Sequence, residues 1–493
     1  MEQHKMIIGG ESVAAVSANW ETVINPASVE EIAEVPQADY ADVNKAVEAA
    51  KSAFTTWSKT SPAERSTLLY KLADALEAKA EQLAMTESLN AGKPIKLAAN
   101  GDIPFAIDNI RYFAGGARVV DGIAAQEFVP GYTSTIRREP IGVIASITPW
   151  NYPFMMAAWK IAPAVAAGNT VVIKPAPQTP LTTLMVAQTA LEVGFPPGVI
   201  NAVTGGGPSV GEPLVTHPDV RLVSFTGSTL TGKRIMELAA QKVTRVHLEL
   251  GGKAPFIVFA DADIEAAARG AVVGAYVNTG QDCTAATRIL VERSKYQEFL
   301  TAFTELSQQV RLGTPQDEKT DMGPLISASQ RQRVHSFVET AKAEGMTPKL
   351  GGEMPEGKGF FYQPTIFCEA PTKSEIMQEE VFGPVVVVNP IDSEAEAIAV
   401  ANDVKYGLAA SVWTKDTAKA WRVASALEFG TVWVNDHLPL ASEMPHGGFK
   451  ESGFGKDLSR YAFEEYTIAK HIMFDLSGEA KKPWHFTAFG DAE

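Results

Sequence analysis

The 493-residue chain contains two thiols, Cys283 and Cys368, and their surroundings differ in a way that matters for chemistry. Cys283 stands among small and polar residues in the segment 280–284, which follows a helical pattern. A nucleophilic thiol needs access and surroundings that stabilise its thiolate, and a polar loop suits both needs better than a core position. An inert buried thiol is the competing interpretation, and Cys368, in the strand-like run 365–368, fits it.

Glu249 and Asn151 can supply the groups that such a thiol works with. Glu249 is embedded in an apolar strand that ends at Gly251-Gly252, and burial there raises the pKa of a carboxyl group toward the range of a general base. Asn151 follows the first apolar run of an alternating region, where its amide can donate to a developing oxyanion. The alternatives are a structural ion pair for Glu249 and a turn-forming hydrogen bond for Asn151.

Two glycine-rich turns follow predicted strands and can bind phosphate through backbone N–H groups. Residues 227–233 match the first seven positions of a P-loop, but Arg234 replaces the hydroxyl residue that holds Mg²⁺, so nucleotide hydrolysis is excluded. Residues 204–211 form the second turn, which departs from the usual dinucleotide fingerprint. Two such turns at neighbouring strand ends predict a cofactor crevice, with ordinary strand-to-helix turns as the alternative.

The elements that must position these groups alternate between short apolar runs and helical stretches from residue 141 onward. This rhythm predicts an α/β fold with two parallel sheets and crossover helices. The predicted strands are 141–147, 170–173, 199–203, 222–225, 246–250, 256–259, 288–292, 385–389 and 431–435. Before them, the run Ser-Pro-Ala-Glu at 61–64 predicts the start of a scaffold helix. A hairpin at 120–140 and a strand at 467–476 lie outside either predicted sheet and suggest a small assembly element.

Composition excludes several classes of protein. Lys and Arg number 43 against 58 Asp and Glu, a net charge of -15, which argues against nucleic-acid binding through phosphate neutralisation. Two cysteines can form neither a disulfide framework nor a four-thiolate metal site, and they fit a reducing cytoplasm. No segment has the apolar length of a signal-peptide core at the N-terminus or of a membrane span later on. We therefore expect a cytoplasmic protein with no membrane span and no bound metal.

The motifs occur in an order that resembles the aldehyde dehydrogenase superfamily over nearly the whole chain. They are the segments 148–153, 174–175, 225–229, 248–253, 280–283 and 379–384. The resemblance implies oxidation of an aldehyde to a carboxylic acid through a thioester on Cys283. It further implies that Asn151 and the Cys283 backbone N–H form the oxyanion hole and that Glu249 is the general base. Lys160 and Asp457 match positions assigned to a proton relay, although Asp457 stands where Glu is common and a scaffold role is the alternative for Lys160.

The resemblance also implies a site for NAD or NADP. Lys174 is expected to hold the adenosine ribose, Glu380 the nicotinamide ribose, and the two glycine turns the adenine side and the pyrophosphate. The full set of expected cofactor residues is Thr148, Pro149, Trp150, Lys174, Pro177, Gly207, Gly211, Gly227, Ser228, Leu250, Glu380 and Phe382. Pro177 departs from the family pattern, because NAD-selective relatives often carry Glu there, so the choice between NAD and NADP stays open.

Within the superfamily the chain is most similar to the aminoaldehyde branch, which includes γ-aminobutyraldehyde and betaine aldehyde dehydrogenases. The segments 280–286, 443–448, 461–467 and 471–473 carry this similarity. Tyr152, Trp159 and Asp282 are expected to surround an ammonium group with two aromatic faces and a carboxylate, with packing along an apolar tunnel as the alternative for the aromatics. Leu438 and Leu440 stand where relatives often have an aromatic residue, which leaves a neutral aliphatic or aryl aldehyde open as the substrate.

The sequence leaves three alternative functions to be considered. A CoA-acylating dehydrogenase passes its thioester to CoA, whereas Glu249 favours hydrolysis. A semialdehyde dehydrogenase needs cationic residues at the aldehyde tail, and the sequence places none beside Asp282. A non-catalytic descendant of the fold is disfavoured because the proposed nucleophile, base and amide are all present.

The resemblance suggests three structural units. A cofactor-binding domain is expected from 1–119 and 141–251, a catalytic domain from 252–466, and an oligomerisation element from 120–140 and 467–493. The last unit implies a homodimer or homotetramer, with a small-molecule aldehyde as the other partner and no nucleic acid or membrane.

Overall fold

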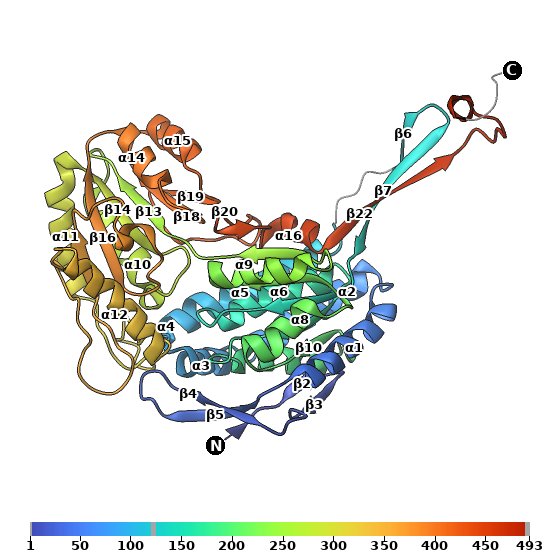
Figure 1. Cartoon of the computed structure of the whole chain (residues 1–493), viewed down its shortest axis with the longest axis horizontal. Helices are drawn as coiled ribbons and strands as arrows, with labels where there is room; N and C mark the ends of the chain where they lie inside the picture. The colour runs from blue at the N-terminus through green and yellow to red at the C-terminus, as the bar shows by residue number, and fades with distance from the viewer. Residues whose placement is uncertain (1, 120–124, 489–493) are drawn as a thin grey trace.

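The computed structural model describes residues 2–119 and 125–488, which form two lobes and a projecting arm (Figure 1). The first lobe contains most of the segments coloured blue to green, and the second lobe contains the yellow and orange segments. The arm extends away from both lobes and combines two strands from the first third of the chain, drawn in cyan, with one from near its end, drawn in red. The α/β fold predicted from the sequence is confirmed.

The first lobe is built on an eight-stranded sheet whose five central strands are parallel. In sheet order the strands are β21 (Gly453–Phe454), β12 (Arg245–Glu249), β11 (Val220–Thr226), β8 (Val143–Ile147), β9 (Thr170–Lys174), β10 (Ile200–Ala202), β2 (Met6–Ile8) and β3 (Glu11–Val13). The five central strands are the five apolar runs predicted between 141 and 250. The outer strands β21, β2 and β3 pair antiparallel with their neighbours.

Helices connect the central strands, as the alternating pattern predicted. They are α6 (Pro153–Ala166), α7 (Leu181–Glu192), α8 (Glu212–Thr216) and α9 (Thr229–Ala240). Every residue of α6 is buried, because this helix packs within the lobe rather than on its surface. Lys160 is the charged residue of α6, so its ammonium group must find a partner inside the protein.

The helices that precede the first sheet are scaffold. They are α1 (Tyr40–Trp57), α2 (Pro62–Glu77), α3 (Ala80–Ala91), the short α4 (Ile95–Leu97) and α5 (Ile103–Gly116). The predicted start of α2 is confirmed, because Ser61 and Glu64 form a reciprocal capping box with Pro62 at the first helical position. A three-stranded sheet of β1 (Glu2–Gln3), β5 (Glu31–Pro36) and β4 (Trp20–Ile24) lies beside them.

The second lobe is built on a six-stranded sheet in which every neighbouring pair is parallel. Its order is β15 (Thr365–Cys368), β16 (Val385–Ile391), β14 (Ala286–Glu292), β13 (Ala254–Val258), β18 (Ala409–Trp413) and β19 (Thr431–Val434). The covering helices are α10 (Ile264–Tyr276), α11 (Tyr296–Gln308), α12 (Ala328–Ala343), α14 (Glu394–Asn402) and α15 (Thr417–Ala426). The predicted strands of this region are therefore present, and the chain changes sheets across Gly251-Gly252.

The arm is a three-stranded antiparallel sheet of β6 (Gln126–Val129), β7 (Tyr132–Pro140) and β22 (Thr467–Asp475). β7 and β22 pair over their full length, from Thr467 opposite Pro140 to Asp475 opposite Tyr132. The predicted hairpin and the predicted remote strand thus meet outside both larger sheets (Figure 1). Residues 120–124 of the predicted hairpin and 489–493 of the predicted oligomerisation element lie outside the described residues.

One boundary differs from the sequence-based division. Residues 453–466 were assigned to the second unit, but β21 pairs with β12 in the first sheet. Helix α16 (Ser459–Glu465) and its neighbour Tyr466 pack into the apolar core of the first lobe. The chain returns across the first lobe before it enters the arm, and no local pattern signals such a return. The functional roles of the three units stay predictions.

Among the residues that the structure describes, none of the helices combines the length and the apolarity needed to cross a membrane.

Candidate active site

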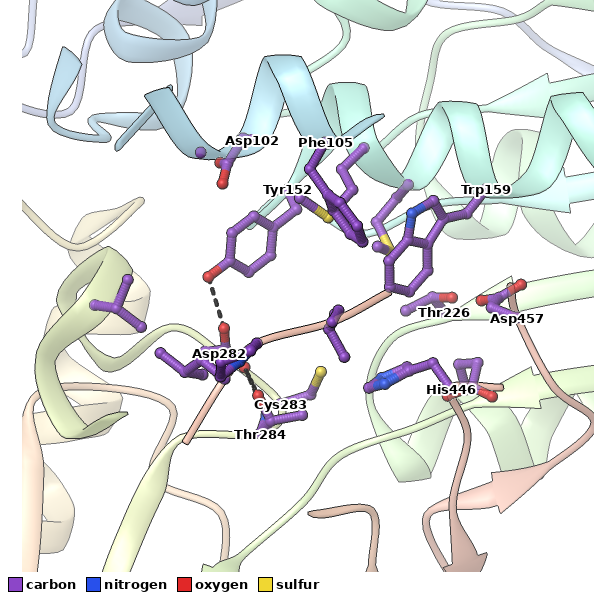
Figure 2. A pocket seen from close by; sticks show the side chains of 18 of the residues that line it. Asp102, Phe105, Tyr152, Trp159, Thr226, Asp282, Cys283, Thr284, His446 and Asp457 are labelled. Carbon is purple, nitrogen blue, oxygen red and sulfur yellow. Dashed lines mark hydrogen bonds between the residues drawn. The ribbon is translucent and has the colours of Figure 1, made fainter. Parts of the chain in front are cut away.

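A cavity of about 380 Å³ opens between the two lobes, and Cys283 lies in its wall (Figure 2). This volume is large enough for a small organic ligand. The lining residues come from both lobes: Leu97, Gly101, Asp102, Phe105, Tyr152, Met155, Met156, Trp159, Thr226, Glu249, Leu250, Val277, Asp282, Cys283, Thr284, His437, Leu438, Pro439, Leu440, His446 and Asp457. Most of the lining residues are apolar, and the carboxyl groups among them belong to Asp102, Glu249, Asp282 and Asp457.

Cys283 occupies the loop between α10 and β14 and is partly exposed toward the cavity, so the expected access is confirmed. The expectation that the surroundings stabilise its thiolate is wrong for the protein without bound cofactor or substrate. Burial raises the pKa of the Cys283 thiol well above its usual range, and the charges of Asp282, Glu380 and Glu249 raise it further. The physical reason is that the charged groups nearest to the sulfur are carboxylates rather than cations.

Cys368 stands apart from the cavity at the end of β15 in the second lobe. It packs against the apolar core of that lobe, as the inert-thiol interpretation predicts.

The cysteine loop is held by hydrogen bonds from several elements. The backbone at Gly252 approaches so closely that a Cβ there would lie 2.1 Å from the Cys283 carbonyl oxygen. His437 Nε2 is 2.8 Å from the Thr284 carbonyl oxygen and must donate to it, because a carbonyl only accepts. Burial lowers the pKa of His437 to about 4, so this imidazole acts as a neutral donor. His437 was not foreseen, since only the fold brings it to the loop.

Asn151 lies behind the cysteine loop and is not among the residues that line the cavity. Its Nδ2 donates to the Gln281 carbonyl oxygen over 3.0 Å, and Asn278 donates to the Asn151 carbonyl oxygen over 2.9 Å. A primary amide carries two N–H groups, so one remains for a ligand oxygen. Asn278 also stands at φ 49°, a conformation that Asn tolerates better than most residues. This asparagine is a positioning residue that the sequence reasoning missed.

Glu249 ends β12 and is buried at the cavity wall. Neither of its carboxylate oxygens has a hydrogen-bond partner among the described residues. Burial raises the pKa of Glu249 well above its usual range, and the nearby charge of Asp457 raises it further. Its nearest basic nitrogen, His247 Nε2, is 3.9 Å away and belongs to a ring whose pKa is far below its usual value, so the alternative of a structural ion pair is not supported.

Lys160 and Asp457 form a buried pair beside Glu249. Lys160 Nζ donates to Asp457 Oδ2 over 2.7 Å, and both side chains are almost fully enclosed. Asp457 is drawn beside Thr226 and His446 in Figure 2 and lines the cavity. The two residues predicted as a relay are thus in contact although they are far apart in sequence.

The expected cofactor residues other than Glu380 and Phe382 lie at or shortly after the carboxyl ends of strands in the first sheet. Lys174, at the end of β9, is buried and donates from Nζ to the carbonyl oxygens of Pro175 and Gly205 over 2.9 and 3.0 Å. Burial lowers the pKa of Lys174 to about 8. Gly211 lies close enough that an added Cβ would be 3.9 Å from Lys174 Cε, whereas a Cβ on Gly207 would meet nothing within 4 Å. The surface at Gly207 is therefore open.

The predicted turn at 227–233 leads into α9. Ser228 caps this helix by accepting from the Thr231 N–H, and Gly227 precedes it. Leu250 packs against Gly232 of the same helix and also lines the cavity. The turn therefore presents the positive end of a helix next to the wall of the cavity.

Aromatic and acidic groups mark the junction between the lobes. Trp150 and Phe382 meet edge to face with ring centroids 5.2 Å apart. Glu380 accepts a hydrogen bond from the Gly252 N–H over 2.9 Å, and burial raises its pKa to about 7. Thr148 donates its N–H to the Lys174 carbonyl oxygen, which ties the neighbouring ends of β8 and β9 together.

Pro149 follows the end of β8, and Pro177 follows the end of the neighbouring strand β9. Neither proline offers a backbone donor, and Pro177 carries no acidic group. If these two prolines contact the cofactor, they do so through van der Waals packing rather than through a backbone N–H or a charge.

The proposed substrate residues all line the cavity. The Tyr152 hydroxyl donates to Asp282 Oδ2 over 2.6 Å, and Asp282 Oδ1 accepts from both the backbone and the hydroxyl of Thr284 (Figure 2). Trp159 donates from its indole to Asn109 over 2.6 Å and meets Phe105 edge to face. Leu438 and Leu440 line the same cavity, as expected for substrate contacts.

A buried lysine corrects the expectation that no cation lies near Asp282. Lys93 Nζ stands 4.1 Å from the centre of the Tyr152 ring, and it pairs with Asp102 and Glu87. One aromatic face of Tyr152 is therefore already occupied by a cation. Lys93 itself is fully buried and does not line the cavity. The sequence contains no local signal for this contact, because Lys93 lies in the loop between α3 and α4 whereas Tyr152 immediately precedes α6.

His247, Glu249 and Asp457 offer ligand atoms that all lie within 4.8 Å of one another. The ammonium group of Lys160 is bonded to one of these carboxylates, which opposes a second cation. The expectation that no metal is bound stays a prediction.

Comparisons with known proteins agree with one another. Residues 13–472 match the family model described as the aldehyde dehydrogenase family. Betaine aldehyde dehydrogenase from Bacillus subtilis is 44% identical over 473 residues, which are 95% of this chain and 96% of the relative. Retinaldehyde dehydrogenase 3 from Mus musculus is also 44% identical, over 93% of this chain and 90% of the relative. The crystal structure of Staphylococcus aureus betaine aldehyde dehydrogenase in complex with NAD+ superimposes with a TM-score of 0.94 at 42% identity, covering 97% of this chain and 95% of that chain.

Proposed function

The chain belongs to the aldehyde dehydrogenase family, and we propose that Cys283, Glu249 and Asn151 carry out its oxidation of an aldehyde to a carboxylic acid. The observation that carries this proposal is that Cys283 and Glu249 line one cavity, with Asn151 bonded to the cysteine loop behind it. These are the three groups that formation and hydrolysis of a thioester require. The enzyme is an NAD(P)-dependent oxidoreductase.

The residues present fit a dinucleotide. Lys174 uses two of its three N–H groups on backbone carbonyls, which leaves one for a ribose hydroxyl. Gly207 is open to solvent, and the turn at Gly227 and Ser228 leads into the N-terminus of α9, whose first backbone N–H groups can donate to a pyrophosphate. Glu380 supplies an acceptor for hydroxyls of the second ribose. NAD, which is the cofactor of the related Staphylococcus aureus enzyme, supplies the hydride acceptor when it is bound.

In the proposed mechanism, the Cys283 thiol loses its proton to water in the cavity, its sulfur bonds to the aldehyde carbon, and the electron pair of the carbonyl bond moves to the oxygen, which gains negative charge. The free N–H of Asn151 and the backbone N–H of Cys283 donate to that oxygen. After oxidation a thioester remains on Cys283, and Glu249 removes a proton from the water that attacks it. The carbon–sulfur bond then breaks, the carboxylic acid leaves, and the Cys283 sulfur takes up a proton from water to restore the thiol. The buried Lys160–Asp457 pair receives the proton from Glu249.

We propose an aminoaldehyde, such as 4-aminobutanal, as the substrate. The cavity wall carries no lysine or arginine side chain among the described residues, and because its Asp102 is already paired with buried Lys93, Asp282 is the carboxyl group that offers its charge to a substrate tail. Its two histidines, His437 and His446, have pKa values near 4 because of burial and are neutral at physiological pH. A cationic tail is favoured in such surroundings, and the anionic tail of a semialdehyde is opposed.

A neutral aldehyde is the second candidate, and the apolar lining supports it. Leu438, Leu440 and Phe105 offer no hydrogen bond to a polar tail, and the carboxylate oxygens of Asp282 are already bonded to Tyr152 and Thr284. Overall identity does not decide between the candidates, because a betaine aldehyde and a retinaldehyde dehydrogenase are equally similar to this chain.

The deciding experiment compares kcat/KM for 4-aminobutanal, betaine aldehyde, pentanal and benzaldehyde, each with NAD and with NADP. Pentanal matches 4-aminobutanal in the number of heavy atoms, so their ratio isolates the contribution of the ammonium group. A preference of about tenfold or more for 4-aminobutanal supports the proposal. A preference for pentanal or benzaldehyde supports the second candidate, and formation of acyl-CoA in the presence of CoA would identify a CoA-acylating enzyme instead.

We further propose that the arm assembles the enzyme into a homodimer or homotetramer, and that the enzyme works in the cytoplasm. Apolar side chains stand exposed on the arm, where Phe128, Ile468 and Phe474 each expose at least half of their surface. Exposed apolar patches of this kind mark interfaces.

A further inference from the structure

His247 lies next to Glu249 although the mechanism above does not use it. The two residues are separated by one position on β12, so their side chains point to the same face of the strand. His247 Nε2 is 3.9 Å from Glu249 Oε1 and 3.8 Å from Asp457 Oδ1. The ring is fully buried and stands between the proposed base and the proposed relay.

A chain of hydrogen bonds is compatible with a proton on Nε2 of this histidine. The Tyr466 hydroxyl donates to Ser224 Oγ over 2.8 Å, and Ser224 Oγ is 3.1 Å from His247 Nδ1. Ser224 accepts the hydrogen bond from Tyr466 and has its own hydroxyl proton to donate to Nδ1, and we take this arrangement, with Nδ1 as the acceptor, because Nε2 faces two carboxyl groups. A neutral imidazole with Nδ1 as an acceptor carries its proton on Nε2. The donor atom therefore faces the two carboxyl groups.

Two glycines hold this geometry from the other side. A Cβ at Gly447 would lie 2.5 Å from Glu249 Oε1, and a Cβ at Gly455 would lie 2.3 Å from His247 Cδ2. Both glycines also have positive φ values, of 154° and 90°, which side-chain-bearing residues rarely adopt. The chain from 447 to 455 thus presses directly on the base and the imidazole and limits their movement.

The polar atoms of His247, Glu249 and Asp457 that face one another lack hydrogen-bond partners. His247 Nε2, both oxygens of Glu249 and Asp457 Oδ1 have no hydrogen-bond partner among the described residues. The separations of 3.8 and 3.9 Å are too long for direct hydrogen bonds but suit one bridging water. A metal ion is a poorer fit, because Lys160 is bonded to Asp457 and Lys456 also lies near the group.

We propose that His247 is a positioning residue that holds one water molecule between Glu249 and Asp457 and so connects the base to its proton relay. The Nε2–H donates to the water, and the water donates to the two carboxyl groups. When Glu249 carries the proton from the hydrolytic water, it passes that proton to the bridging water. The bridging water releases one of its own protons to Asp457, so that Glu249 becomes a carboxylate again and the water is unchanged. This inference rests on the proposed role of Glu249 as the base.

The charges around the pair define the expected pH effect. The groups that face Glu249 or His247 are Lys160, Arg245, Lys456, Asp457, Glu465, Tyr466 and Cys283. Burial and the lysines keep the pKa of His247 well below its usual range, so it donates as a neutral group throughout the working pH range. A donor that reaches a carboxylate through water favours the ionised form. Loss of His247 should therefore raise the pKa of Glu249 and move the acidic limb of deacylation to higher pH.

The test measures the deacylation rate against pH in pre-steady-state experiments on the full-length enzyme with NAD. We expect His247→Leu to move the acidic limb upward by about 0.5 to 1 pH unit, as loss of one water-mediated hydrogen bond to the carboxylate would do, while the burst of NADH is retained. His247→Gln keeps an N–H near the Nε2 position and should restore most of the wild-type profile. A merely structural role would instead lower the rate equally at every pH.

Second variants keep the proposal testable if His247→Leu does not fold. Ser224→Ala and Tyr466→Phe release Nδ1, which lets the proton leave Nε2, and both should move the limb in the same direction by a smaller amount. An unmoved acidic limb in folded His247→Leu, or in Ser224→Ala and Tyr466→Phe where His247→Leu fails to fold, overturns the inference. Glu249→Gln separates the two proposals, since unchanged turnover in that variant contradicts the base itself rather than its connection to Asp457.

Discussion

The hydroxyl of Tyr152 donates to the carboxylate of Asp282 over 2.6 Å, one residue before the proposed nucleophile. The two side chains come from different lobes, and Lys93 lies under the aromatic ring. This contact fixes a carboxylate at the cavity wall and uses one of its oxygens. Because the hydrogen bond joins the two lobes, the position of the Asp282 carboxylate in the cavity depends on how the lobes are aligned.

Asp282→Asn tests whether that charge recognises an ammonium group. The variant keeps a hydrogen-bonding side chain beside Tyr152 and Thr284 but removes the negative charge. We expect KM for 4-aminobutanal to rise about tenfold with little change for pentanal. Asp219→Asn, which removes a surface carboxylate paired with Lys51, is the matched control and should affect neither substrate. Equal changes for both aldehydes in the Asp282 variant would exclude recognition of the ammonium group.

Removal of the proposed nucleophile should separate the two thiols. Cys283→Ala should lower dehydrogenase activity by about three orders of magnitude or more, because no other thiol lies in the cavity wall among the described residues. Binding of NAD, followed by quenching of protein fluorescence, should persist. Cys368→Ala should retain activity near that of the wild type, since Cys368 packs in the second lobe. Full turnover by the Cys283 variant would contradict the mechanism.

Replacement of the proposed base Glu249 should make hydrolysis of the thioester the rate-limiting step. In Glu249→Gln, formation of the thioester needs no base from this residue, so a burst of NADH should appear in stopped-flow absorbance. The following steady rate should fall about 100-fold, as expected for loss of a general base. Glu465→Gln, on the outer side of the same buried group, is the control and should change the steady rate only slightly. A steady rate equal to the wild type in Glu249→Gln argues that another group activates the water.

Affinity for NAD should increase with pH near neutrality. Burial raises the pKa of Glu380 to about 7, so this group is mostly a carboxylic acid at pH 6 and mostly a carboxylate at pH 8. The carboxylate is the better acceptor for ribose hydroxyls, and by linkage the Kd for NAD should fall about fivefold to tenfold over this range. Fluorescence titration measures it. In Glu380→Gln the same titration should show little pH dependence, and a dependence equal to that of the wild type would assign the effect to another group.

A charge on the arm should weaken assembly. Ile468 and Phe474 stand on the same face of β22, since they are an even number of positions apart, and both are about half exposed. We expect Ile468→Asp combined with Phe474→Asp to lower the molecular mass in analytical ultracentrifugation to that of smaller assemblies. Val243→Asp changes an apolar residue that is 92% exposed on the first lobe and should leave the mass unchanged. An unaltered assembly in the arm variant would place the interface elsewhere.

The sequence by itself determined the regular elements and the identity of the reactive groups. Alternating apolar runs predicted both parallel sheets, and the capping residues Ser61 and Glu64 predicted the start of α2, because these signals are local. Short segments of sequence also place Cys283 in a polar loop and Glu249 at the end of an apolar strand. Burial of Glu249 and the direction of its pKa shift could therefore be predicted.

Only the tertiary structure decided how these groups act on one another. The contacts of Lys93 with Tyr152, of His437 with Thr284 and of His247 with Asp457 join segments that carry no mutual signal. No sequence pattern indicates that residues 453–466 return to the first lobe. The pKa of the Cys283 thiol shows the physical reason: its direction depends on burial and on carboxylates from three separate segments, and electrostatic interactions depend on distance through space rather than along the chain.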